Sequence, residues 1–133
     1  EQLKDAGIRA EINLLPSSEF WGIWDKTRLG FTSWAHRPLG FMVLGLAYRS
    51  GVPWNESHFN DAEFDETLTQ AEGIPDARER SKLIGKLETI MQERGPIVQP
   101  IWLGRYTPWH ENVLGYNAHP TLYIFGHELA LKS

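Results

Sequence analysis

Apolar and polar residues alternate near the start of the chain. Every second position of residues 8–14 is apolar, with Arg9, Glu11 and Asn13 between. A period of two is typical of a strand with one buried face, so we expect a strand over 8–14 that Pro16 ends.

Residues 2–7, which precede this strand, have the composition of the last turn of a helix that ends at Gly7. A single turn does not form a helix alone. We therefore expect the sequence to be the C-terminal part of a longer protein, the alternative being a frayed natural N-terminus.

Helical spacing of apolar residues predicts four helices further along. Their expected ranges are 19–26, 38–46, 62–72 and 75–94. Ser17 or Ser18 is expected to cap the first, and Asn60 or Asp61 the third. The fourth has the clearest apolar face, formed by Leu83, Ile84, Leu87, Ile90 and Met91.

Two apolar runs predict further strands, at residues 31–34 and 97–103. Helices that alternate with strands predict an α/β fold with crossover connections. From Gly104 onward the chain is rich in loops and aromatic residues, and such a segment usually packs onto another surface. Where that surface is missing, we expect these aromatic side chains to be unusually exposed or to pair between copies of the chain.

Composition narrows the class of protein. The chain has 133 residues, of which 41% are hydrophobic and 23% charged, which fits one globular domain. The net charge of −4 argues against nucleic acid as a partner. Since there is no cysteine, disulfides, thiolate zinc sites and cysteine nucleophiles are excluded.

The strongest candidate for chemistry is the segment of residues 31–40. It places Trp34, His36 and Arg37 at the predicted end of a strand, before Pro38. Open α/β sheets hold ligands at strand ends, and an arginine favours a carboxylate or phosphate. Trp34 can stack on a ligand or belong to the core, so both interpretations stay open.

Two further candidates lie in a turn-rich segment. Trp54 is expected either at the rim of a cleft or in local packing, with Asn55 beside it.

His36 could donate a hydrogen bond, contact a metal chelate or be a surface group. The five histidines form no i, i+4 pair and no H-E-x-x-H pattern, so we expect no resident metal.

Catalysis is the rival class of function. Asp61, Glu63, Asp65 and Glu66 could suggest a glycosidase pair, but negative charge at a helix N-terminus explains them more simply. No G-x-S-x-G, G-x-G-x-x-G or Walker motif is present. We expect no enzyme activity, no catalytic residue and no cofactor.

The order of features resembles the C-terminal region of the periplasmic solute-binding proteins of peptide- and nickel-type ABC transporters. The similar pieces are the helix-to-strand junction at residues 3–8, the strand end at Trp34 followed by a proline, the segment from Asn55 to Asp65, the helix over 78–94 and the entry into residues 95–100. Asn55 to Asp65 resembles that family's Y-x-N-P-E-F-D segment, and 95–100 is similar to its A-P-x-I-P-L stretch.

The resemblance implies an α/β, periplasmic binding protein-like fold of class II, in which two lobes close on a ligand by hinge motion. Residues 1–103 would form most of the second lobe. Residues 104–133 would cross the hinge and pack on a first lobe, which is supplied by sequence N-terminal to this chain. The implied function is capture of a peptide-like or carboxylate-bearing solute in the periplasm, for delivery to an ABC permease.

At one position of the candidate segment, this chain differs from the family that it resembles. Peptide-binding relatives have an aspartate three residues after the strand-end tryptophan, where it pairs with the peptide's amino group; this chain has Arg37. The reversed charge implies a carboxylate or another anion there, or a structural salt bridge of Arg37. Residues expected to contact ligand are Trp34, His36, Arg37, Trp54 and Asn55. A metal chelate or an oligosaccharide is the alternative ligand, and a hydrolytic enzyme domain the more distant alternative.

Overall fold

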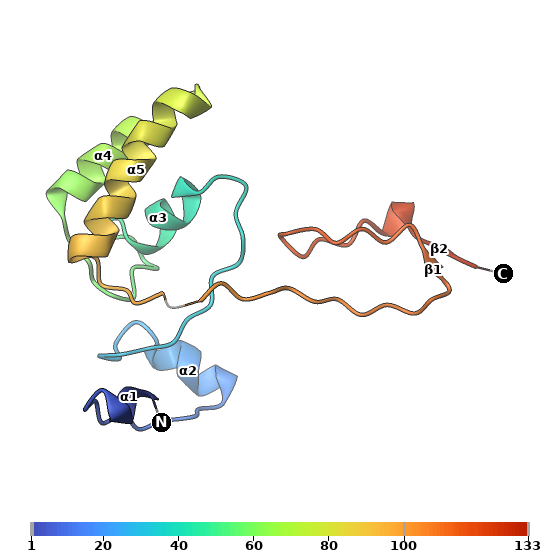
Figure 1. The fold of residues 1–133 in the computed structure, drawn as a ribbon, viewed down its shortest axis with the longest axis horizontal. Helices are drawn as coiled ribbons and strands as arrows, with labels where there is room; N and C mark the ends of the chain where they lie inside the picture. The colour runs from blue at the N-terminus through green and yellow to red at the C-terminus, as the bar shows by residue number, and fades with distance from the viewer. Residues whose placement is uncertain (1, 100, 133) are drawn as a thin grey trace. The chain divides into compact units, whose positions relative to one another are not determined.

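The computed structural model describes residues 2–99 and 101–132, as five α-helices, a short 3-10 helix and two short strands (Figure 1). The order is α1 (Gln2–Asp5), α2 (Ser17–Ile23), α3 (Phe41–Ala47), α4 (Ala62–Glu72), α5 (Ala77–Arg94), β1 (Val113–Leu114), η1 (Gly126–Glu128) and β2 (Ala130–Leu131). The chain consists of two compact units, residues 1–31 and residues 32–133. This division differs from the predicted boundary after residue 103, which stays a prediction about a longer protein.

The first unit contains α1 and α2. Gly7 has a φ of 78°, and the Ile8 N–H donates to the Leu3 carbonyl at 2.8 Å. This left-handed glycine with its long return hydrogen bond is a Schellman helix end, so the predicted helix end at Gly7 is confirmed. The predicted serine cap of α2 is wrong, because Ser17 and Ser18 lie inside its first turn, after Pro16.

The strands predicted at 8–14, 31–34 and 97–103 are absent from the described residues of those segments. Most of their apolar side chains are exposed instead: Ile12 is 87% exposed and Val98 92%, whereas Trp34 is half-buried. A strand needs a neighbour to pair its backbone groups, and alternation alone does not supply one. These three strand predictions are therefore wrong for the structure of this chain, and the α/β class stays a prediction.

Helices α3, α4 and α5 of the second unit enclose the hydrophobic core. Figure 1 shows α4 and α5 side by side. α3 contacts α4. Phe64, Leu68 and Ala71 of α4 meet Leu87, Ile90 and Met91 of α5 in one buried cluster. These are the helix faces that the spacing of apolar residues predicted, so both are confirmed. Met42 of α3 is exposed.

Aspartates fix where α4 and α5 begin. Asp61 Oδ1 accepts from the Phe64 N–H at 2.9 Å, which settles the predicted choice between Asn60 and Asp61. Asp76 Oδ1 accepts from the N–H groups of Arg78 and Glu79, both at 2.9 Å. Each carboxylate satisfies donors that a helix N-terminus leaves free.

The C-terminal segment forms a small antiparallel hairpin. β1 pairs with β2 in the register Val113 to Leu131 and Leu114 to Ala130. The expected exposure of aromatic residues in this segment is confirmed. The exposed side chains are Tyr106, Trp109, Tyr123 and Phe125. Tyr116 is half-buried, and its ring lies 4.7 Å from that of Trp109.

Candidate functional site

Residues 32–37 of the candidate segment belong to the second unit and form neither helix nor strand. In the described part of the chain, no backbone–backbone hydrogen bond holds these residues. Trp34 is half-buried and packs against the core, Arg37 is half-buried, and His36 is exposed. Side chains rather than a sheet therefore hold this segment in place.

The structure brings together two of the predicted site residues. The rings of Trp34 and Trp54 have centroids 5.9 Å apart and planes tilted by 52°. Trp54 keeps about half of its surface exposed, at 48%. Trp34 therefore contacts the core and Trp54 presents aromatic surface to solvent, while a ligand contact of either tryptophan stays a prediction.

Asn55 is buried and organises its own loop. Its Nδ2 donates to the carbonyl oxygens of Arg49 at 3.1 Å and Phe59 at 2.8 Å. Its Oδ1 accepts from the Phe59 N–H at 3.0 Å and from the Ser57 hydroxyl at 2.9 Å. The structure thereby supplies a local role for the whole amide group, and a ligand contact of Asn55 stays a prediction.

Glu56 joins the loop to the candidate segment, and the sequence did not reveal this. Thr32 Oγ1 donates to Glu56 Oε2 at 2.6 Å across 24 positions of sequence. Burial first, and the Glu56 carboxylate second, raise the pKa of Tyr48 above its ordinary value of 10.0. The sequence around Glu56 does not identify Thr32 as its hydrogen-bond partner, because Glu56 lies in a turn-rich segment without a periodic pattern.

Two donors of the candidate segment have no acceptor. Trp34 Nε1 and Arg37 Nε are both buried atoms without a hydrogen-bond partner among the described residues. An unpaired buried N–H costs about 1–3 kcal/mol, so such groups in native proteins are normally paired. Within the described residues Arg37 also forms no salt bridge, so the structural alternative has no partner in this part of the chain.

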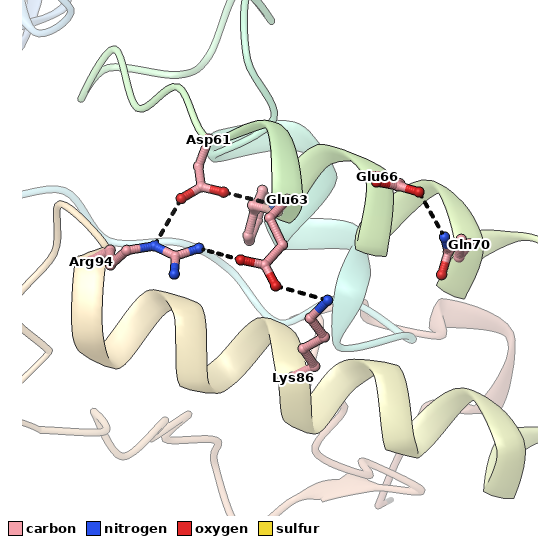
Figure 2. Close-up of polar contacts among 7 residues, drawn as sticks. Asp61, Glu63, Glu66, Gln70, Lys86 and Arg94 are labelled. Atoms are coloured by element: carbon pink, nitrogen blue, oxygen red, sulfur yellow. Dashed lines mark hydrogen bonds and ion pairs between the residues drawn. The ribbon is translucent and has the colours of Figure 1, made fainter.

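The predicted helix-terminal acidic residues form an ion network with α5. Figure 2 shows Arg94 of α5 reaching Asp61, with Nε to Oδ2 at 3.0 Å, and Glu63, with Nη2 to Oε2 at 2.9 Å. Lys86 Nζ lies 2.9 Å from Glu63 Oε1. Arg94 is exposed to solvent, and its guanidinium links the C-terminal end of α5 to the N-terminal end of α4.

Among the residues that the structure describes, no three histidine, aspartate or glutamate side chains gather as a metal site would require. His119, for example, contacts Thr121, Tyr123 and Phe125. The carboxylates at the start of α4 are held by cations and by the backbone, which gives them a structural role.

The ion network predicts an acid-sensitive contribution to stability. Hydrogen bonds from Lys86 and then Arg94 lower the pKa of Glu63 below its ordinary value of 4.5. Because the folded pKa is depressed, the contribution is complete above about pH 4.5 and disappears as the pH falls through the folded pKa. Glu63→Gln should therefore flatten the dependence of the urea midpoint on pH below about pH 4.5.

The matched control is Glu66→Gln in the same helix. Glu66 Oε1 accepts from the neutral Gln70 amide at 3.2 Å and from no cation (Figure 2). We expect this variant to keep the wild-type pH dependence. The assignment to Glu63 would be contradicted if the urea midpoints of wild type and Glu63→Gln depended equally on pH. It would also be contradicted if added salt left the pH dependence of the wild type unchanged.

None of the described helices combines the length and the apolar composition that crossing a lipid bilayer requires. Comparison of the chain with protein-family models, with curated proteins and with solved structures found no match.

Proposed function

We propose that this chain is part of a solute-binding protein of the peptide- and nickel-type ABC importers. Trp34 and Arg37 would face a carboxylate-bearing, peptide-like solute. The observation that carries the proposal is the pair of buried donors without acceptors, Trp34 Nε1 and Arg37 Nε. A bound carboxylate supplies acceptor oxygens of the kind these donors lack, and its charge complements the guanidinium.

The other residues of the site fit this assignment in part. Trp34 and Trp54 add aromatic surface, which contributes contact area and attraction for apolar or cationic parts of a solute. His36, two residues after Trp34, is exposed and can donate a hydrogen bond.

In the proposed mechanism, the solute binds between two lobes and stabilises the closed state through its extra contacts. Residues 1–103 belong to the second lobe, and 104–133 return to a first lobe that lies N-terminal in the longer protein. The closed protein then delivers the solute from the periplasm to the permease. The exposed aromatic residues after Gly104 support this assignment, since they offer an apolar surface to such a lobe.

The test is calorimetry of the full-length protein with matched dipeptides. One carries both free termini, one an acetylated amine and one an amidated carboxylate. We expect acetylation to preserve binding and amidation to weaken it, because the recognised group is the carboxylate. Arg37→Asp should weaken binding of the free dipeptide by roughly 10- to 100-fold, the loss of a hydrogen bond to a charged group with added repulsion.

Arg78→Asp is the matched control for charge reversal. Arg78 is exposed in the first turn of α5, and its own side chain forms no hydrogen bond or salt bridge in the described part of the chain. We expect it to bind the free dipeptide like the wild type. Equal affinity of wild type and Arg37→Asp for that dipeptide would refute the proposed role of Arg37.

A further inference from the structure

We propose that Thr32, Asn55 and Glu56 are positioning residues that hold Trp34 against Trp54. Their effect on ligand binding rests on the proposed function, whereas their effect on the tryptophan pair does not. Neither Thr32 nor Glu56 was a candidate from sequence, and Asn55 was expected to contact the ligand. The contacts of the described residues assign all three to the support of the site.

The first step is the loop that carries Trp54, residues 49–59, which is tied to α4. Arg49 Nη2 contacts Glu72 Oε2 at 2.7 Å, and Arg49 Nη1 donates to Thr69 Oγ1 at 2.9 Å. The Ser50 N–H donates to Asp65 Oδ1 at 3.0 Å. One end of the loop is thereby fixed to a helix of the core.

The second step is the interior of this loop. The four hydrogen bonds of Asn55 link Arg49 to Phe59, near the two ends of the loop. Successive turns add backbone bonds from Asn55 to Val52 at 3.1 Å and from His58 to Asn55 at 3.1 Å. Trp54 therefore projects from a closed loop whose shape the buried amide sets.

The third step is the contact between this loop and residues 32–37. Backbone pairing does not hold residues 32–37, so the hydrogen bond from Thr32 to Glu56 is a specific polar contact that fixes their position. Thr32 lies two residues before Trp34, and Glu56 two residues after Trp54. The Thr32–Glu56 hydrogen bond and the Trp34–Trp54 ring contact therefore join residues 32–37 to the loop of residues 49–59 at neighbouring positions. Together they hold the two rings in place before any ligand binds.

This arrangement also defines the aromatic surface. With ring centroids 5.9 Å apart, Trp34 and Trp54 contact each other and form one continuous surface rather than a slot. Because Glu56 is engaged by Thr32, its bonded oxygen serves the protein rather than a ligand cation. Arg37 is left as the charged group of the segment that has no ion-pair partner among the described residues.

The experiment measures the exciton coupling of the two indoles by far-ultraviolet circular dichroism of the full-length protein. Trp21 and Trp24 form a second close pair, at 5.8 Å, so all variants carry Trp21→Phe. The difference between this background and its Trp54→Phe variant gives the Trp34–Trp54 couplet. We expect Thr32→Val and Glu56→Ala to lose most of this couplet. Glu56→Gln should retain it, because the amide oxygen still accepts from Thr32.

Dipeptide affinity, measured on the same variants, separates this inference from the proposed function. We expect Glu56→Ala to bind more weakly and Glu56→Gln to bind like the background. A couplet that persists in both Thr32→Val and Glu56→Ala overturns the inference. The inference is also overturned if Thr32→Val and Glu56→Ala lose the couplet but keep the dipeptide affinity of the background, while Arg37→Asp weakens that affinity. If the background binds no dipeptide, the proposed function fails, and the couplet alone still decides whether Thr32 and Glu56 position the rings. Urea midpoints confirm that each variant is folded.

Discussion

Phe64→Ala is expected to lower the free energy of unfolding of the helical unit by about 3–5 kcal/mol, the cost of removing a buried phenylalanine. Phe64 is 0% exposed and lies in the centre of the cluster between α4 and α5. Its ring also meets that of Phe59 edge to face, with centroids 5.4 Å apart. The substitution removes buried area, leaves a cavity and loses this aromatic contact together. Urea unfolding followed by circular dichroism at constant pH measures the loss.

Phe31→Ala is the matched control because it is the same chemical change at an 80% exposed position. Exposed substitutions usually change stability by less than about 0.5 kcal/mol, and we expect this variant to stay within that range. Similar losses for the two variants would contradict the location of the core.

Asn55→Ala is expected to cost about 2–3 kcal/mol, since each buried polar group left without a partner costs about 1–3 kcal/mol. Asn55 is 6% exposed, and its side chain serves the Arg49 and Phe59 carbonyl oxygens and the Phe59 N–H. Truncation leaves these groups unpaired or more weakly paired inside the loop. The measurement is again the urea midpoint, with the slope checked for a change in compactness.

Asn55→Asp separates lost hydrogen bonds from lost volume. It keeps nearly the same shape and the acceptor for the Phe59 N–H, but replaces the donor to two carbonyl oxygens by a carboxylate oxygen. We expect it to be destabilised at neutral pH and to recover partly in acid, where the protonated carboxyl can donate again. Asn60→Ala, at an exposed position five residues on, is the control and should remain close to wild type.

The helices of the second unit were predictable because their signals are local. The predicted cap at Asp61 directly precedes α4, and the periodic apolar faces lie within α4 and α5 themselves. An apolar face at helical spacing has the same meaning whichever neighbour covers it. This is why the core around Leu68 and Leu87 followed from the sequence.

Strands depend on neighbours that the sequence does not name. The alternation over 8–14 describes a segment suited to a sheet edge or interior, yet its pairing requires a second segment in register. In this structure Ile12 and Leu14 are exposed and no partner strand is described. The only described ladder is instead the short pairing of β1 with β2.

The site was predictable in its residue types but not in its contacts. An arginine and two tryptophans near turns indicated binding chemistry, and the structure places Trp34 against Trp54. The hydrogen bond from Thr32 to Glu56 and the ion pairs of Arg94 join residues 24 to 33 positions apart. Such pairings depend on how separate elements pack, which periodicity and composition do not encode.

The location of the core also bears on the order in which the chain folds. Every buried hydrophobic side chain that the structure describes lies between Ala47 and Met91. Contacts over such short sequence separations close small loops, and proteins rich in them fold within about microseconds to milliseconds. On a ribosome, α3 and α4 would therefore wait only for α5 to emerge before the unit closes. The rest of the chain would then be added to a nucleus that is already formed.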